Sequence, residues 1–455
     1  MNALKYYSTN LQAEPVSFRE ALLKGLAPDR GLFMPEDIPQ IATDELKSYS
    51  NMDYDEIAYA VLRKFLHNEI PDDELQALVK DAYDFPVPLE QVYEKKYVMR
   101  LDQGPTASFK DFAARVMGRL MQYFLKKEQR SLLILTATSG DTGSAIANAF
   151  YGLDNIKVLV LFPEKEVTDR QRKQMTTLHD NIHIIALDGK FDDCQALVKQ
   201  AFSDLDLDGL NLSSANSINI GRLLPQTLYY VYAFAKLREG KSDDQIVFSV
   251  PSGNFGDLMG GLIAKKMGLP VKKFVVATNE NDEFPKYLAT GEYHTIVPSR
   301  DCLSSAMNVG HPSNVARLIA LYGGQMDETG TIENEPDLAQ IREDMYAVSV
   351  SDNDTKAMIR EAYNTHTLLL EPHGSVSWAG LMRYLNENSS DDTAEQVCVS
   401  LETAHPAKFP EVVREILNID PDLPPSLEGL DAKEEIFATM GNNYEQFKRY
   451  LQKHY

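Results

Sequence analysis

The sequence predicts an α/β protein in which parallel strands are covered by helices on both faces. Two observations lead to this fold class. From about residue 96 onward, short apolar runs bounded by glycines alternate with amphipathic segments, which is typical of successive βαβ units. Before residue 83, apolar residues instead recur at three- and four-residue steps, which predicts a mostly helical part. At roughly 150 residues per domain, the 455 residues have room for about three such units.

The N-terminal part contains three candidate helices. Each has apolar residues at helical spacing, and the second and third begin close to Thr or Asp residues that favour helix starts. They cover residues 17–27, 43–66 and 72–84. Residues 84–96 are predicted to form an extended connector, because Pro86 and Pro88 disfavour helix. The final part of the chain again has a helical pattern, and we expect it to lie at the periphery.

The middle of the chain alternates between strand and helix candidates. The strand candidates are residues 131–138, 156–163, 182–189, 245–250, 272–279 and 396–400. The helix candidates between them are residues 144–152, 191–202, 222–237 and 257–268. Residues 280–350 have no clear pattern. Ligand sites of such folds lie at the carboxyl ends of the strands, so we searched the turns that follow them.

The charge balance excludes several classes of protein. There are 45 Lys and Arg residues against 67 Asp and Glu residues, which gives a formal net charge of −22. Nucleic acids and anionic membrane surfaces attract a basic face, so neither is an expected partner. No run approaches the roughly 18 apolar residues of a membrane span, and the N-terminus lacks the apolar core of a secretory signal.

The three cysteines, Cys194, Cys302 and Cys398, lie far apart in the sequence. This spacing argues against a zinc ribbon or a disulfide framework and is typical of a reducing compartment. We therefore expect a cytoplasmic location and no metal site. The sequence also lacks HExxH, GxxxxGK[ST] and GxGxxG, which removes the main support for metalloprotease, P-loop and simple dinucleotide-binding functions.

Lys110 lies at the predicted start of an amphipathic helix in LDQGPTASFKDFAARVMGRLM. Apolar residues recur at helical spacing from Phe109 onward, and Ser108 and Asp111 have the spacing of an N-terminal capping box. The positive end of the helix dipole opposes a cation there, so we expect the pKa of the Lys110 amine to be lowered. Schiff-base chemistry needs such a neutral amine. The alternative is a solvated surface lysine.

Two glycine-containing turns each follow a strand candidate and open a helix. In TATSGDTGSA, residues 136–145, backbone N–H groups and the hydroxyls of Thr138, Ser139 and Thr142 suit a carboxylate. In VPSGNFGDLMGG, residues 250–261, Gly253 and Gly256 permit a tight turn that suits a phosphate. Each turn alone is equally consistent with a purely structural strand-to-helix connection.

A third turn, SLETAHPAKFP at residues 400–410, follows the last strand candidate. Thr403 is placed to offer a hydroxyl to a buried heteroatom, or else it is a plain capping residue. His405 is equally consistent with a structural histidine. A lysine at a helix start, two anion-binding turns and a hydroxyl together suit a cofactor that carries a phosphate and an aldehyde.

In their order along the chain, these motifs resemble the threonine synthase family of fold-type II enzymes, which depend on pyridoxal 5′-phosphate (PLP). The resemblance covers nearly the whole chain through SFREALLKGLAPDRGLFMPEDIP, GPTASFKDF, TATSGDTGSAIANAFYG, NLSSANSINIGR, VPSGNFGDL, EPHGSVSWAGL and TAHPAKF. It implies a fold like that of tryptophan synthase β, with two parallel or mixed-sheet α/β subdomains and the active site between them. The implied domains are a helical N-terminal domain, a PLP-binding core and a helical C-terminal extension, at residues 1–83, 96–410 and 411–455.

The resemblance also implies roles for individual residues. Lys110 corresponds to the lysine that binds PLP as a Schiff base and shuttles protons, and Thr403 to the residue whose hydroxyl meets the pyridine nitrogen. The implied phosphate turn for PLP consists of Gly253, Asn254, Phe255, Gly256 and Asp257. Asp141 occupies a position where related enzymes often carry Asn in contact with the 3′ oxygen of PLP. An ionised Asp141 would repel that phenolate unless it were protonated or turned away.

The substrate-binding residues are implied in the same way. Thr138, Ser139 and Thr142 match a loop that faces the substrate carboxylate. A second segment matches one that binds the substrate phosphate, where the planar arginine fork suits bidentate contact; it contains Asn216, Ser217, Asn219 and Arg222. Because the chain is so acidic, we expect anion binding to be a local property of these groups.

The implied reaction converts O-phospho-L-homoserine and water to L-threonine and phosphate, the last step of threonine biosynthesis, with PLP as the electron sink. By resemblance we expect a monomer. One alternative is a PLP-dependent phospho-lyase or dehydratase that gives 2-oxobutyrate. Another is a non-catalytic binding protein that keeps the PLP fold.

Overall fold

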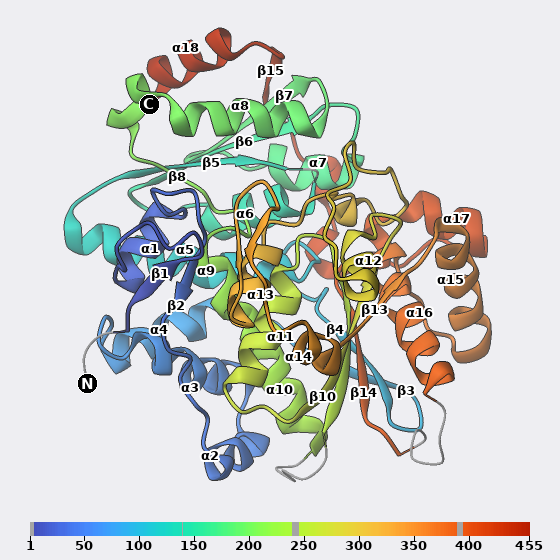
Figure 1. Ribbon diagram of the computed structural model, residues 1–455. Helices are drawn as coiled ribbons and strands as arrows, with labels where there is room; N and C mark the ends of the chain where they lie inside the picture. The colour runs from blue at the N-terminus through green and yellow to red at the C-terminus, as the bar shows by residue number, and fades with distance from the viewer. Residues whose placement is uncertain (1–3, 139, 239–244, 389–394) are drawn as a thin grey trace.

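Two large sheets organise the chain, one at the top of Figure 1 and one at the lower right. The computed structural model describes residues 4–138, 140–238, 245–388 and 395–455. The five-stranded sheet has the order β15-β7-β6-β5-β8, and all its pairs are parallel. The six-stranded sheet has the order β13-β10-β9-β14-β4-β3, with only β3 antiparallel to its neighbour. The predicted α/β fold with parallel and mixed sheets is confirmed.

The five-stranded sheet separates two layers of helices (Figure 1). Its strands are β5 (Leu132–Ala137), β6 (Ile156–Pro163), β7 (Ile182–Asp188), β8 (Leu212–Ser213) and β15 (Ala438–Gly441). The helices are α6 (Asp141–Phe150) and α7 (Asp169–Thr176) on one side, and α8 (Phe191–Ser203) and α18 (Tyr444–His454) on the other. Leu133 and Leu135 pack in one cluster with Phe447 of α18, whereas Ile134 packs in the main core. This alternation is the two-residue period of a strand buried on both faces.

The six-stranded sheet is buried in the same way. Its strands are β3 (Leu89–Tyr93), β4 (Lys96–Arg100), β9 (Ile246–Pro251), β10 (Val271–Thr278), β13 (Met345–Ser349) and β14 (Cys398–Glu402). Four helices cover it: α10 (Thr227–Arg238), α11 (Gly256–Lys266), α15 (Asp352–His366) and α16 (Pro372–Glu387). Val247 and Val275 pack with Trp378 of α16, and Phe248 and Val276 face the main core.

The predicted extended connector at residues 84–96 is partly an antiparallel hairpin, formed by β3 and β4. Pro86 and Pro88 precede β3, so neither has to donate a ladder hydrogen bond. The other neighbour of β4 in the sheet is β14, more than half the chain away. Local sequence patterns carry no signal for such a pairing.

The N-terminal part contains the expected helices and a small antiparallel sheet. These elements are β1 (Tyr6–Ser8), α1 (Phe18–Lys24), β2 (Phe33–Pro35), α2 (Thr43–Ser48), α3 (Tyr54–Leu66) and α4 (Asp72–Ala82). The predicted helix over 43–66 is divided by a 3₁₀ turn at Tyr49–Asn51. Asp53 and Glu56 then form a capping box that starts α3 afresh.

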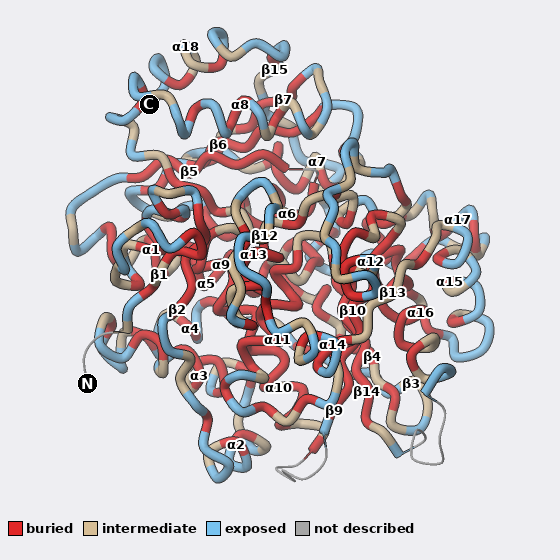
Figure 2. Tube along the Cα trace, viewed as in Figure 1, coloured by how far each residue is buried: buried red, intermediate tan, exposed pale blue. Residues whose placement is uncertain are grey.

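The remaining elements connect these layers. They are α5 (Lys110–Glu128), α9 (Ile220–Leu223), α12 (Glu283–Thr290), α13 (Val315–Leu321), β11 (Gln325–Met326), β12 (Ile332–Asn334), α14 (Leu338–Asp344) and α17 (Pro410–Leu417). Figure 2 shows that buried residues run continuously through both sheets and through the helices between them. Among the described residues, no helix is long and apolar enough to cross a membrane.

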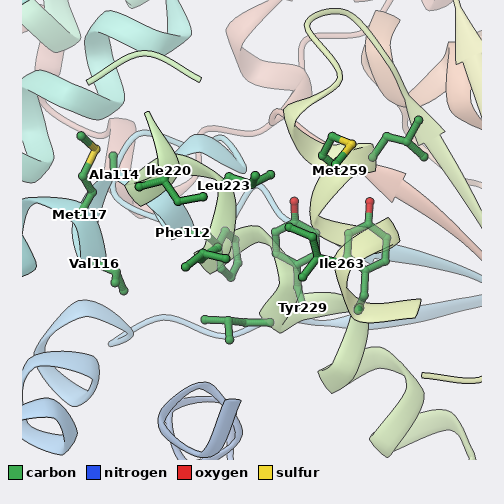
Figure 3. Close-up of a cluster of buried hydrophobic side chains, with 14 of the residues drawn as sticks. Phe112, Ala114, Val116, Met117, Ile220, Leu223, Tyr229, Met259 and Ile263 are labelled. Carbon is green, nitrogen blue, oxygen red and sulfur yellow. The ribbon is translucent and has the colours of Figure 1, made fainter. Parts of the chain in front are cut away.

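A cluster of buried apolar side chains packs α5, α9, α10 and α11 together (Figure 3). Phe112 and Met117 of α5 pack in the same core as Leu223 of α9, Tyr229 of α10 and Met259 of α11. The rings of Phe112 and Tyr229 lie edge to face, with centroids 5.6 Å apart. This packing holds the first turns of α5 and α11 in fixed positions.

Candidate active site

Three separate turns meet at the start of α5, where Lys110 is the first helical residue. The backbone N–H of Phe109 donates to the carbonyl oxygen of Thr403 at 2.9 Å, and Ser108 forms an antiparallel bridge with Ala404. Lys110 Nζ lies 3.7 Å from Asp141 Oδ2 at the start of α6. Asp141 and Thr403 follow the carboxyl ends of β5 and β14. Both therefore lie beside the same helix start, as the fold class predicts.

The surroundings of Lys110 lower the pKa of its amine. Its side chain is 13% exposed, and Nζ lies 4.7 Å from the centroid of the Phe109 ring. Burial lowers the pKa of Lys110, and the nearby cations Lys408 and Arg222 lower it further, against the attraction of Asp141. The predicted direction is confirmed, with burial as the largest cause.

The predicted capping box at Ser108 and Asp111 was wrong. Among the described residues, Ser108 Oγ has no hydrogen-bond partner. Asp111 instead accepts from the backbone N–H and the hydroxyl of Thr106, at 2.8 and 2.6 Å. Gly104 makes room for this contact, because an added Cβ there would lie 2.5 Å from Asp111 Oδ2. The helix therefore starts without a side-chain cap, and the loop before it takes the carboxylate.

Asp141 is ionised and paired. Its Oδ1 accepts from Lys408 Nζ at 2.7 Å and from Gln171 Nε2 at 2.8 Å. Burial favours the neutral acid, but Lys408 and Lys110 outweigh it and hold the pKa of Asp141 well below its usual range. Sequence reasoning missed Lys408, although its motif TAHPAKF was noted. A lysine just after a fully buried strand was the available signal.

The turn between β5 and α6 is built around Thr138 and two glycines. Thr138 Oγ1 accepts from the backbone N–H groups of Gly140 and Gly143, at 3.0 and 2.8 Å, which leaves its hydroxyl hydrogen free to donate. Gly140 has φ +133°, and an added Cβ would lie 2.5 Å from Gln171, so this position requires glycine. Thr142 is half-buried and has no side-chain partner among the described residues. Ser139 lies outside the described residues.

The turn between β9 and α11 presents free backbone donors. The N–H groups of Gly253, Asn254 and Phe255 have no acceptor within the described part of the chain. Gly253 is required, because an added Cβ would lie 2.9 Å from the backbone at both Ala306 and Met307. Phe255 adopts φ +62°, which turns the chain into the first residue of the helix, Gly256. Such a nest at a helix N-terminus suits an anionic group.

The Asp257 carboxylate points away from this turn. Its Oδ1 accepts from the hydroxyls of Tyr229 and Tyr230, at 2.6 and 2.7 Å. Burial raises the pKa of Asp257 to about 6, although both hydroxyls act in the opposite direction. The two tyrosines of α10 thus hold one carboxylate oxygen, while Oδ2 is buried with no partner among the described residues.

The segment before α9 lies beside the same turn. Asn254 Nδ2 donates to Ser217 Oγ at 2.5 Å, which links the two. Asn219 caps α9, with its amide donating to Leu22 and Ser214 and its oxygen accepting from Gly221, all at 2.9 Å. Asn219 is thus fully engaged within the protein.

Arg222 and Asn216 retain unused polar atoms. Arg222 Nη1 donates to Ala215 O at 2.7 Å, while its buried Nε and Asn216 Oδ1 have no partner among the described residues. Burial lowers the pKa of Arg222 to about 10, so the guanidinium stays charged at neutral pH. A second buried arginine, Arg317, donates to the carbonyls of Ser217 and Ile218 at 3.1 and 2.6 Å. This segment is accordingly flanked by positive charge.

Thr403 and His405, the two polar residues of the turn after β14, have different surroundings. Thr403 is 6% exposed, and its hydroxyl has no partner in the described ranges. His405 Nδ1 accepts from Ala407 N at 3.1 Å, and burial lowers the pKa of His405 to about 4. His405 is therefore a neutral structural histidine, one of the two interpretations that its sequence context permitted.

Sequence reasoning did not anticipate two buried acids, Glu371 and Glu402, next to Thr403. Glu371 caps α16 and contacts His373 Nδ1 at 2.5 Å, and His373 Nε2 accepts from Ala306 N at 3.0 Å. Burial and the neighbouring Glu371 raise the pKa of Glu402 far above its usual range. The motif EPHGSVSWAGL thus supports Ala306, whose carbonyl lies against Gly253 of the β9–α11 turn.

Sequence profiles of known families match almost the whole chain. The profile "Threonine synthase N terminus" matches residues 5–83, "Pyridoxal-phosphate dependent enzyme" matches 86–401, and "Threonine synthase, C-terminal" matches 380–451. Threonine synthase from Haemophilus influenzae is 40% identical over 453 residues, which cover 99% of this chain and 100% of that protein. The chain belongs to the threonine synthase family of PLP-dependent enzymes.

Solved structures of family members have the same fold. A crystal structure of PLP-bound threonine synthase from Brucella melitensis matches with a TM-score of 0.91 and 36% identity over 99% of each chain. The Escherichia coli threonine synthase structure matches with a TM-score of 0.87 and 37% identity, covering 99% of this chain and 100% of that one. The predicted family, fold type and cofactor dependence are confirmed.

The residues present fit PLP. The β9–α11 turn offers free N–H donors to a phosphate, and Lys110 offers an amine of lowered pKa to an aldehyde. Thr403 has a hydroxyl with no partner among the described residues. An ionised Asp141 is compatible with the 3′ oxygen of PLP, because Lys408 neutralises its charge.

Proposed function

We propose that this enzyme converts O-phospho-L-homoserine and water to L-threonine and phosphate. The observation that carries the proposal is the presence of two further anion-binding places near Lys110, besides the turn suited to the cofactor phosphate. One is the β5–α6 turn with Thr138 and Thr142, and the other contains Arg222 and Asn216. A substrate with a carboxylate at one end and a phosphate at the other matches this arrangement.

Four groups of this chain would hold the cofactor: Lys110, the Gly253–Gly256 turn, Thr403 and Asp141. When bound, PLP supplies an aldehyde for the substrate amine and an electron sink for carbanion chemistry. Thr403 offers a neutral hydroxyl where some enzymes use a carboxylate, which leaves the pyridine nitrogen without a counter-charge. We propose that Asp257 stabilises the same turn through its backbone and its tyrosine contacts.

The remaining work falls to the protein's own side chains. Lys110 Nζ, made less basic by burial, takes the proton from the substrate Cα and returns it at the end of the cycle. The β5–α6 turn orients the carboxylate, with Ser139 and Thr142 as further hydroxyl donors. Arg222 and Asn216 hold the phosphate that leaves from Cγ, with Ser217 beside them and Asn219 shaping the helix start.

The decisive experiment is product identification. Purified enzyme with PLP and O-phospho-L-homoserine should release phosphate and threonine in equal amounts, as measured by a phosphate assay and chromatography. Release of 2-oxobutyrate and ammonia would support the phospho-lyase instead. Stoichiometric PLP binding without any turnover would support a non-catalytic binding protein.

Borohydride reduction tests the cofactor lysine separately. Reduction of the holoenzyme followed by peptide mass spectrometry should place the pyridoxyl group on Lys110. Lys408 is the matched control, because it contacts the same carboxylate from a fully buried position. Modification of Lys408 would overturn the assignment of Lys110.

We also propose a cytoplasmic monomer divided at residues 1–83, 96–410 and 411–455. The expected helical character of the last part was incomplete, because its strand β15 extends the five-stranded sheet beside β7. All three cysteines are buried and free, which supports a reducing compartment. Size-exclusion chromatography with light scattering would test the oligomeric state: a mass near the 51.1 kDa of one chain is expected, and a mass near twice that value would refute the monomer.

A further inference from the structure

Asp141 presents its two carboxylate oxygens to two different lysines. Lys408 Nζ donates to Oδ1 at 2.7 Å and to the carbonyl oxygen of Thr106 at 2.8 Å. Gln171 Nε2 donates to the same Oδ1 at 2.8 Å. The other oxygen, Oδ2, lies 3.7 Å from Lys110 Nζ. One lysine is thus tightly bound to the carboxylate, and the other stands apart from it.

We propose that Lys408 is a positioning residue that neutralises Asp141 and so releases Lys110 from acting as the counter-ion of that carboxylate. The inference rests on the proposed role of Lys110 as the lysine that binds the cofactor. The role of Lys408 depends on the carboxylate of Asp141, which faces both lysines.

Lys408 is built for this role. Its side chain is 0% exposed, and both of its hydrogen bonds are to fixed partners. A buried lysine with no anionic partner is costly, as is a buried carboxylate with no cation, so each residue requires the other. Lys408 also follows directly from the turn that carries Thr403, so the β14 end places the cation and the hydroxyl together.

Without Lys408, Lys110 would become the counter-ion of Asp141. Asp141 would keep Gln171 but lose its tightest cation, and the nearest remaining cation is Lys110. Held as a counter-ion, Lys110 would retain its proton and lose nucleophilicity towards an aldehyde. The charged groups that act on Lys110 are Asp141 and Glu371, which favour its protonation, Lys408 and Arg222, which oppose it, and Asp257.

The test is the pH at which Lys110 becomes reactive in the full-length, cofactor-free protein. Pulse acetylation across a pH series, read by peptide mass spectrometry, gives the midpoint for Lys110. Lys408→Met should move this midpoint to higher pH and lower the acetylation rate at neutral pH several-fold. The double variant Asp141→Asn/Lys408→Met removes both charges and should restore a midpoint close to that of the wild type.

Lys265→Met is the matched control, because Lys265 forms an ion pair of the same length, 2.7 Å, with Asp344 away from the site. It should leave the Lys110 midpoint unchanged. In the holoenzyme, the pH-dependent absorption change of the bound cofactor should shift upward in Lys408→Met in the same way. A merely structural role for Lys408 would lower the thermal midpoint without moving either pH midpoint.

An unchanged Lys110 midpoint in folded Lys408→Met would overturn the proposal. Should Lys408→Met fail to fold, the double variant decides: a Lys110 midpoint far from that of the wild type would overturn it equally. These measurements involve no substrate, so they are separate from the proposed function. Failure to make threonine with a shifted midpoint would refute the reaction and leave the role of Lys408 intact.

Discussion

Asn254 Nδ2 lies 2.5 Å from Ser217 Oγ, and this contact joins the turn before α11 to the segment before α9. The other end of the Asn254 amide accepts from Ser313 N at 2.7 Å, and its backbone carbonyl accepts from Asn314 at 2.9 Å. A single side chain therefore ties the proposed cofactor-phosphate turn to the proposed substrate-phosphate segment.

Asn254→Ala should weaken the binding of both PLP and the substrate. Loss of these contacts leaves Ser313 N without its partner and frees the turn, at a cost of about 1–2 kcal/mol or roughly tenfold in affinity. PLP titration of the cofactor-free enzyme and the KM for O-phosphohomoserine measure the two effects. Ser217→Ala removes only the hydroxyl and should have a smaller effect on PLP. Equal PLP affinity in wild type and Asn254→Ala would contradict the link.

Arg222→Ala should separate substrate binding from cofactor binding. The guanidinium is charged, buried and only partly engaged, so its loss should lower kcat/KM by about a hundredfold or more while PLP affinity stays the same. Arg222→Lys keeps the charge without the planar fork, so its kcat/KM should lie between those of the wild type and Arg222→Ala. Circular dichroism controls for folding. Wild-type kcat/KM in Arg222→Ala would refute the assignment.

Thr403→Val should reveal whether the hydroxyl contacts the cofactor. Valine has nearly the same shape but no hydroxyl, so a ligand atom would lose one hydrogen bond worth about 1 kcal/mol. We expect a severalfold lower PLP affinity and a shifted absorption maximum of the holoenzyme. Thr403→Ser keeps the hydroxyl and should resemble the wild type. If Val and Ser variants behave alike, Thr403 acts only through its backbone contact with Phe109.

Asp257→Asn should change how stability depends on pH. The folded-state pKa of Asp257 is raised to about 6, so the folded protein holds this proton more tightly than the unfolded chain does. This stabilisation is present below about pH 4 and is lost as the pH rises through about 6, a change of up to about 3 kcal/mol. Urea unfolding at pH 4.5 and 7.5 should therefore show wild type losing stability relative to Asp257→Asn. A pH-independent difference would contradict this.

Residues whose placement follows from their neighbours in sequence were predictable. Lys110 at a helix start and the free donors around Gly253 follow from a strand, a glycine turn and an amphipathic helix in succession. The same local reasoning failed for Asp111, because its carboxylate turns back to Thr106 rather than along the helix. Two acceptable partners lay within a few residues, and only the loop conformation selects between them.

Contacts across the fold were out of reach of sequence patterns. Asp141 and Lys408 follow strands of different sheets, β5 and β14, and no local pattern indicates that they form a 2.7 Å ion pair. The repulsion expected between Asp141 and a phenolate left out the charge of Lys408, which pairs with Asp141. The tyrosine contacts of Asp257 were hidden for the same reason, since α10 supplies them from another part of the chain.

The position of β14 has a consequence for synthesis on the ribosome. This strand lies between β9 and β4 in the six-stranded sheet, although it is the last of the six to be translated. Until residues 398–402 emerge, β4 and β9 have no partner to bridge them, and Thr403 and Lys408 do not yet exist beside Lys110. The nascent chain must therefore carry an open sheet for most of its synthesis, which is the stage at which chaperones protect unpaired strands.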